Sequence, residues 1–454
     1  MEIAAVAVPI LVQIAALALF FMGAGMFVVL LKGCFVLRRM ARSTPRDYKE
    51  VLLKSPMVPA VSTIAIPRDA SEESRQFTRR LLDLHFGRNE VVIVLDGPNE
   101  TELETWIREL RLTASSRPVA EDLPMAPVRG VYESRDPIRV VVVDKESGGV
   151  ADSWNAGVNA ASSPVVGILE PENEFEPMVL LRLIQPMLES YEDTIAVCGV
   201  APPPPAEGMA AQFGALESLR AWLTRCAAYS ERNMLLPIPG CGVLVRRDAV
   251  IHAGGFTGGK LELFMRLHAL ALAAKKPYRI AFLPQPVSYR RVPDNFTDLR
   301  RMVMRDQREI AAAYHNRSFI AGPWGWQALR ELYCARSVRP KLEMALYLLA
   351  VFGLVAGWVD VYLALLVLLS TVAMGMVLSM GAVVLREVVD PNSADPKRMA
   401  AMFFAAIPEN FGYRQLRNLW LIAGFRGQAG RERKGSGKTA QGRPSEAAVS
   451  SQKK

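Results

Sequence analysis

The chain has 454 residues, 51% of them hydrophobic and 22% charged, and a formal net charge of +9. This length accommodates one large domain or two ordinary ones, and the apolar excess favours membrane segments attached to a globular body. Five cysteines without a C-x-x-C pair argue against a zinc site or a disulfide framework, and basic residues that are not interleaved with aromatics argue against a nucleic-acid partner.

An uncharged apolar stretch from Ile3 to Leu31 opens the chain. As a helix it would be roughly 43 Å long, which exceeds the ~30 Å of hydrocarbon in a bilayer. A cleaved signal peptide is the alternative, but no basic segment precedes the stretch. We therefore predict an uncleaved transmembrane anchor over residues 1–32. The basic linker over residues 33–58 then places the downstream chain in the cytoplasm by the positive-inside rule.

The globular body begins with a strand, a helix and a second strand. Val61 to Ile66 is an apolar strand, a helix follows through Leu84, and Glu90 to Leu95 is the next strand, which ends at Asp96. This order predicts a mostly parallel sheet, with ligands bound outside the carboxyl ends of its strands. The polar connection from Thr113 to Asp136 reads as a surface insertion.

A second β-α-β unit ends in a group of acids. Val140 to Val143 and Val165 to Leu169 are predicted strands with a helix between them, and Glu170 and Glu172 follow directly. Carboxylates at the end of a parallel strand line the ligand crevice, and oxygen ligands suit a divalent cation. A solvated acidic loop is the alternative.

The motifs in chain order resemble those of the family 2 glycosyltransferases with the GT-A fold. They are most similar to the membrane-anchored branch that includes cellulose and hyaluronan synthases. The matching elements are Val94-Leu95-Asp96-Gly97, Gly149 to Asn155, Glu170-Pro171-Glu172, Gly240 to Arg247, Gly254-Gly255-Phe256, Gly259 to Leu267, and Gln307-Arg308.

The resemblance implies a site for a nucleotide sugar. Asp96 matches an aspartate that holds the uracil of the donor, and Asn155 matches an asparagine that orders the nucleotide site. Gln307 and Arg308 fall on the last substrate-binding motif. The Arg-Trp pair that completes this motif in the family is Ile310-Ala311 here, so a processive grip on the product is not expected.

The resemblance also implies a metal site and a catalytic base. Glu170 and Glu172 stand where the family's acids bind Mn²⁺ or Mg²⁺, which neutralises the departing diphosphate. The family's catalytic aspartate falls on Lys260, and lysine is a poor base unless burial lowers its pKa. Glu262 is the nearest carboxylate and our candidate catalytic residue, although on a helix it points roughly 200° away from Lys260.

The segment over residues 296–341 contains the pattern of an amphipathic helix at a membrane interface. Leu299, Val303 and Ile310 lie near one side of the stretch from Phe296 to Arg317, and many arginines lie elsewhere. An ordinary packed helix is the alternative. Trp324, Trp326 and Tyr333 suit the aromatic belt of a membrane interface.

Two apolar runs, broken at Asp360, predict a transmembrane hairpin over residues 342–385. Residues 386–426 form a further interfacial segment, in which Glu409 to Gln415 resembles a run near the C-terminus of these membrane glycosyltransferases. Residues 427–454 are polar and basic, which predicts a disordered tail near an anionic membrane face.

The predicted fold class is therefore α/β, a Rossmann-like GT-A domain over residues 59–295 with transmembrane helices on both sides. The predicted protein is a multi-pass glycosyltransferase of the inner (plasma) membrane with its catalytic domain in the cytoplasm. It moves a sugar, expected to come from a UDP-sugar, to a glycan or lipid-linked acceptor in polysaccharide or cell-envelope synthesis. The alternative is a pseudoglycosyltransferase that acts as a scaffold for polysaccharide assembly partners, which the altered base position favours.

Overall fold

The computed structural model describes residues 2–42, 55, 58–135, 139–171, 173–200, 208–230, 233–237, 241–286, 288–290, 292–315, 329–389 and 396–424. Glu172, Trp324, Trp326 and the tail predicted to be disordered lie outside the described residues, as does most of the linker after the anchor.

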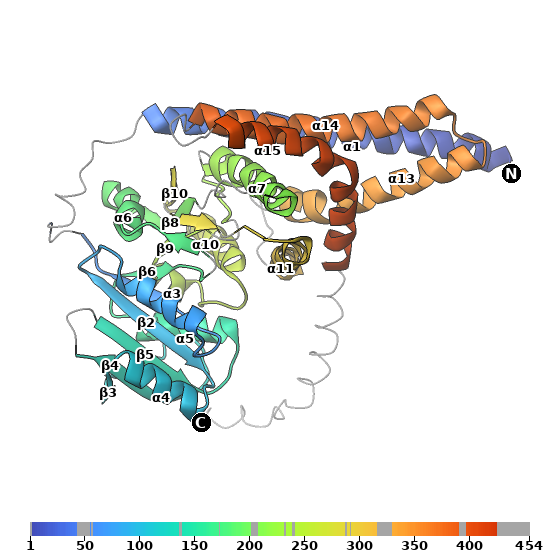
Figure 1. Ribbon diagram of the computed structural model, residues 1–454. Coiled ribbons are helices and arrows are strands. Elements are labelled where there is room, and N and C mark those ends of the chain that lie inside the picture. The colour runs from blue at the N-terminus through green and yellow to red at the C-terminus, as the bar shows by residue number, and fades with distance from the viewer. Residues whose placement is uncertain are drawn as a thin grey trace, which may run out of the picture.

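In the described part of the chain, a nine-stranded sheet with the order β10-β8-β9-β6-β1-β2-β5-β4-β3 forms the centre of the body (Figure 1). Its strands are β1 (Val61–Ala65), β2 (Asn89–Asp96), β3 (Leu112–Ser115), β4 (Val128–Ser134), β5 (Arg139–Lys145), β6 (Val165–Ile168), β8 (Thr194–Val200), β9 (Val243–Arg246) and β10 (Arg279–Pro286). The pairs β1 with β2, β1 with β6, β2 with β5, and β8 with β10 are parallel. Runs of valine and isoleucine build these central strands because they are buried on both faces. The mostly parallel α/β sheet confirms the predicted fold class.

The expected surface insertion after Thr113 is wrong in part. β3 and β4 lie in this stretch and extend the sheet by antiparallel pairing, with Val131 of β4 opposite Val143 of β5. These strands at the edge of the sheet are partly exposed and carry polar side chains, so the sequence lacks the apolar run that indicates a buried strand. A two-stranded sheet of β7 (Asn173–Phe175) and β11 (Ser288–Arg290) follows the acidic loop.

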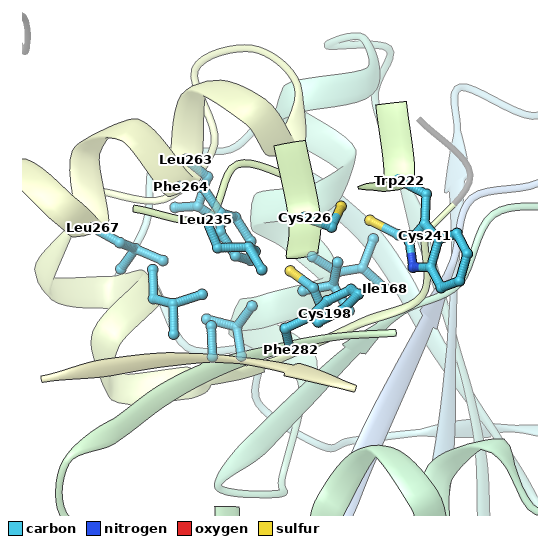
Figure 2. Close-up of a cluster of buried hydrophobic side chains, with 14 of the residues drawn as sticks. Ile168, Cys198, Trp222, Cys226, Leu235, Cys241, Leu263, Phe264, Leu267 and Phe282 are labelled. Atoms are coloured by element: carbon cyan, nitrogen blue, oxygen red, sulfur yellow. The ribbon is translucent and has the colours of Figure 1, made fainter. Parts of the chain in front are cut away.

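Helices cover both faces of the sheet and bury two hydrophobic cores. One core contains Phe77 of α3 (Glu72–Leu82), Trp106 of α4 (Glu100–Glu109) and Leu183 of α6 (Val179–Glu189). The other core contains residues of α5 (Val150–Ala160), α7 (Met209–Ala221), η1 (Trp222–Ala227), α9 (Arg247–His252) and α10 (Lys260–Ala274). Figure 2 shows part of this second core, where Cys198, Cys226 and Cys241 lie among Trp222, Phe264 and other apolar side chains. These three cysteines are buried free thiols.

The second core continues into the apolar helices at the two ends of the chain. It includes Leu30 and Leu37 of α1 (Glu2–Arg42), together with residues of α14 (Val361–Val389) and α15 (Pro396–Pro408). Figure 1 shows α1, α14 and α15 running together over α7, while the N-terminus and the connection between α13 (Arg339–Val355) and α14 lie at one end. The chain turns between α13 and α14 at residues 356–360, and the Asp360 carboxylate accepts a hydrogen bond from the N–H of Leu363 at 2.6 Å at the start of α14. The membrane insertion of this predicted hairpin stays a prediction.

Two helices, Ala5–Met40 and Val361–Glu387, are long and apolar enough to cross a membrane. Many of their large apolar side chains face outward, for example Ile14 and Phe21 of α1 and Leu369 of α14. By length and composition, these helices suit a hydrocarbon environment.

The helix predicted to lie at a membrane interface is α11 (Phe296–His315). Its apolar residues Leu299, Val303 and Ile310 are buried against protein. They pack toward α7, α10 and η3 (Leu329–Val338), as the packed-helix alternative expects. The interfacial placement of this helix stays a prediction.

Candidate functional site

Asp96 lies at the carboxyl end of β2 and organises the turn that follows β5. Its Oδ1 accepts hydrogen bonds from Lys145 Nζ at 2.6 Å and from the N–H of Gly148 at 2.9 Å, and its Oδ2 accepts one from the N–H of Gly149 at 3.0 Å. Lys145 is fully buried and also lies 2.6 Å from Asp152. Burial acts to raise the pKa of Asp96, but these donors outweigh it and hold the pKa below its usual value. Asp96 is therefore a fixed carboxylate whose oxygens already support the Gly-Gly turn.

Asn155 joins α5 to two loops. Its side-chain amide donates to the carbonyls of Pro124 at 3.0 Å and Phe256 at 3.1 Å, and its Oδ1 accepts from the N–H of Phe256 at 2.6 Å. Gly255 has a φ of 72°, and a Cβ there would overlap the Asn155 oxygen, so this close approach requires glycine. Asn155 positions the loop beside the site, and its role in nucleotide binding stays a prediction.

Lys260 at the start of α10 forms a buried ion pair with Glu170, which follows β6. Its ammonium also donates to the carbonyl of Cys241 at 3.1 Å. Burial acts against the charge, but Cys241, Glu170 and Glu309 outweigh it and raise the pKa of Lys260 above its ordinary value. Lys260 therefore stays protonated and cannot act as a base. The Glu170 carboxylate is paired with its ammonium group.

These two residues line a pocket of about 220 Å³, which we call the Lys260 pocket. Its charged and aromatic walls come from Trp154, Glu170, Lys260, Arg305, Asp306 and Glu309. Trp154 is held in place by stacking on Phe256, with the ring centroids 5.6 Å apart. The pocket thus combines two cationic groups, three carboxylates and an aromatic wall at the carboxyl end of β6.

Glu309 of α11 is one of several pocket residues that were not predicted from the sequence. Its carboxylate accepts a hydrogen bond from the backbone N–H of Leu261 in the first turn of α10, and Gly259 leaves the space for it. Burial raises the pKa of Glu309, and the nearby Lys260 only partly opposes this shift. The signal that could have found it is the i, i+3 spacing of Asp306 and Glu309, which places both acids on one side of a helix.

The other predicted residues lie apart from the described lining of the Lys260 pocket. Glu262 is buried and accepts a hydrogen bond from the Thr257 hydroxyl. Gln307 is fully buried and donates to the carbonyl of Arg336 at 3.0 Å, whereas Arg308 is on the exposed side of α11. The catalytic role of Glu262 and the substrate-binding roles of Gln307 and Arg308 stay predictions.

The predicted metal site can be judged only at Glu170, because Glu172 lies outside the described residues. Within the described ranges, no three histidine, cysteine, aspartate or glutamate side chains are grouped to hold a metal ion. The charge of Glu170 is already balanced by Lys260. A cation at Glu170 would have to displace or repel this ammonium, so the described donors do not fit a resident metal.

No protein-family model and no curated protein sequence matches the chain. Among solved structures, a mannosyltransferase from Pyrobaculum calidifontis in complex with GDP-Man and Mn²⁺ superposes with a TM-score of 0.52. The alignment has 16% sequence identity and covers 88% of this chain and 99% of the mannosyltransferase. The chain has the GT-A fold.

Two other GT-A structures are more distant. The structure of TarS residues 1–349 from S. aureus has a TM-score of 0.36 at 13% identity. The alignment covers 83% of this chain and 92% of the TarS chain. Glucosyl-3-phosphoglycerate synthase from Mycobacterium tuberculosis, in complex with Mn²⁺, UDP and its product, has a TM-score of 0.35 at 14% identity and covers 60% of this chain and 84% of its own. Neither similarity is close enough to support an argument about this site.

Proposed function

We propose that the chain is a membrane-bound glycosyltransferase that moves a sugar from a nucleoside-diphosphate sugar to a glycan or lipid-linked acceptor. The supporting observation is the Lys260 pocket, which lies at the carboxyl end of β6 in a GT-A fold, where α/β sheets bind their ligands. The apolar helices α1 and α14 support attachment to the membrane, with the body on the cytoplasmic side. Polysaccharide or cell-envelope synthesis is the proposed setting.

The proposed step is a direct displacement with inversion at the anomeric carbon. An acceptor hydroxyl oxygen forms a bond to that carbon, and the bond from the carbon to the donor's phosphate oxygen breaks. The electron pair of the broken bond leaves with the nucleoside diphosphate. Lys260 and Arg305 supply positive charge in the pocket against the charge that develops on this leaving group.

Glu309 is the proposed proton acceptor of this step. A carboxylate in the pocket must take the proton of the acceptor hydroxyl, and a raised pKa makes a carboxylate a better base near neutral pH. Trp154 offers a flat apolar wall against which a sugar ring can lie. The family resemblance suggested Glu262 for the base, and the two assignments predict different variants to be inactive.

The sequence predicted Mn²⁺ or Mg²⁺ as a cofactor, but no step of the proposed reaction depends on a metal ion. A divalent ion would add Lewis-acid stabilisation of the diphosphate, with Glu170 and Glu172 as its carboxylate ligands. Since Glu170 is paired with Lys260, we propose that the ammonium supplies the positive charge that such an ion would otherwise provide.

The test is release of UDP or GDP from a panel of sugar nucleotides by the full chain in detergent with added membrane lipid. Glu309→Gln keeps the hydrogen-bond acceptor for Leu261 and removes the base, so we expect turnover to fall about 100-fold or more. Glu189→Gln, at an exposed position on α6, is the matched control. Unchanged turnover in Glu309→Gln with loss in Glu262→Gln would move the base to Glu262.

The second candidate is a scaffold that binds a nucleotide without turnover. The observation that favours it is the cation at Lys260, where the resemblance expects the catalytic acid. Nucleotide binding with no release of nucleoside diphosphate from any donor, in a folded sample with lipid acceptors, would support the scaffold against the transferase.

A further inference from the structure

Five arginines gather where the body meets the apolar helices. Arg220 lies on α7, Arg336 on η3, Arg339 at the start of α13, and Arg414 and Arg417 follow η4 (Glu409–Tyr413). We call them the arginine cluster. They line a single cavity although they are far apart in the sequence, so the fold has brought them together.

Three glutamates compensate part of this charge. The ion pairs are Arg336 (3.0 Å) and Arg417 (2.6 Å) with Glu217, Arg220 (2.6 Å) with Glu409, and Arg414 (2.8 Å) with Glu343. Burial acts to raise the pKa of Glu217, but Arg417 and Arg336 outweigh it and hold the pKa far below its usual value. Glu217 is therefore ionised, and by formal charge the five arginines exceed the three glutamates of the described lining by two.

Arg339 is the arginine without a carboxylate. No carboxylate of the described residues lies within ion-pairing distance of the Arg339 guanidinium. Burial and then repulsion from Arg414 lower the pKa of Arg339 to about 10, so it still carries its charge at neutral pH. A half-buried charge of this kind is costly unless an anion pairs with it.

The cavity beside Arg339 has a volume of about 110 Å³. Its lining combines the arginine cluster with the apolar residues Met26 and Leu30 of α1 and Leu378 of α14. A cavity needs roughly 10–15 Å³ of such volume to hold one water molecule, so this cavity has room for a group of the size of a phosphate. A lining of cationic and apolar side chains suits the headgroup end of an anionic lipid whose chains follow α1 and α14.

We propose that the arginine cluster binds the phosphate group of an anionic amphiphile, and that Arg339 is its principal ligand. Arginine suits this task because its planar guanidinium donates two parallel hydrogen bonds to phosphate oxygens. The sequence run Glu409 to Gln415 then acquires a role, since Glu409, Asn410, Tyr413 and Arg414 line the same cavity. The site does not depend on sugar transfer.

Binding of three probes to the delipidated full chain, measured by calorimetry, tests the proposal. Dioctanoyl phosphatidic acid carries phosphate and acyl chains, inorganic phosphate carries only the phosphate, and dioctanoylglycerol carries only the chains. Arg339→Gln breaks no ion pair among the described residues, so the variant is expected to fold and to be at least as heat-stable as the wild type without ligand. We expect it to weaken binding of phosphatidic acid about tenfold or more, because a charge-assisted hydrogen bond is lost.

Two further variants make the result specific. Arg300→Gln removes the same charge at an exposed position on α11 and is expected to change binding less than twofold. Arg339→Lys keeps the charge but loses the paired donors of the guanidinium, so its affinity is expected to lie between those of Arg339→Gln and the wild type. Tight binding of phosphatidic acid alone assigns the site to a lipid headgroup, and equally tight binding of phosphate assigns it to a soluble phosphate compound. Equal affinity in Arg339→Gln and wild type, or equal binding of dioctanoylglycerol, would overturn the proposal.

Discussion

Lys260 keeps its charge although its side chain is almost completely buried. Desolvation alone would favour the neutral amine, but Cys241, Glu170 and Glu309 lie close enough to reverse the effect. The chemistry available at one residue is thus set by its partners from β6 and α11 and not by the identity of its own side chain alone.

His268 of α10 provides a residue-level prediction for the dependence of stability on pH. Its Nε2 donates to the carbonyl of Leu235 at 2.8 Å, so its Nδ1, 2.9 Å from the Tyr278 hydroxyl, is the acceptor of a neutral ring. Burial lowers the pKa of His268 from its ordinary value of 6.5 to about 4. Below pH 6.5 the unfolded chain therefore binds a proton that the native state does not.

The free energy of unfolding should therefore fall as the pH decreases from 6.5 through 4, by about 3 kcal/mol at most for this group. Denaturant unfolding at several pH values in detergent measures it, and His268→Gln should show a smaller fall over this window. A variant whose stability changes with pH as steeply as that of the wild type would contradict the assignment.

At the scale of elements, the contact of α1 with η1 shows how the N-terminal helix attaches to the body. Leu30 and Leu37 belong to the hydrophobic core of the body, and a Cβ at Gly33 would overlap the carbonyl oxygen of Leu223. A glycine at this position lets the two backbones approach closely. The helix is therefore packed on the globular body over its C-terminal half.

Gly33→Ala tests this attachment. We expect a loss of about 1–3 kcal/mol in unfolding free energy, because the extra methyl group must displace the η1 backbone. Gly25→Ala on the same helix is the control, since no atom lies within 4 Å of a Cβ there, and it should be neutral or slightly stabilising. Thermal unfolding in detergent compares them, and equal melting temperatures for the two variants would show that α1 does not dock as described.

The sequence predicted elements whose signals are local and missed contacts that depend on distant segments. Runs such as Val91 to Leu95 predicted β2, and the acids after such runs predicted the functional edge of the sheet. The pairing of Glu170 with Lys260 joins positions far apart in the chain, and no local pattern indicates it. Glu309 looks in the sequence like any polar residue of an amphipathic helix. Its place in the pocket depends on the packing of α11 against α10.

At the scale of the whole molecule, α11 and η3 connect the two candidate sites. α11 contributes Asp306 and Glu309 to the Lys260 pocket, and between them Gln307 binds the backbone of Arg336. Arg336 itself belongs to the arginine cluster, where it pairs with Glu217. A ligand at the cluster therefore touches an element that is packed directly on the helix carrying the proposed base.

The central claim is that a nucleotide site in this GT-A fold uses Lys260 as its cation. Calorimetric titration of UDP and GDP into the full chain, in EDTA and again in Mn²⁺, tests it most directly. We expect binding in EDTA, a loss of about tenfold or more in Lys260→Met, and equal or tighter binding in Glu170→Gln, which releases the ammonium from its ion pair. Binding that appears only with Mn²⁺, is lost in Glu170→Gln and is unaffected in Lys260→Met would contradict the account.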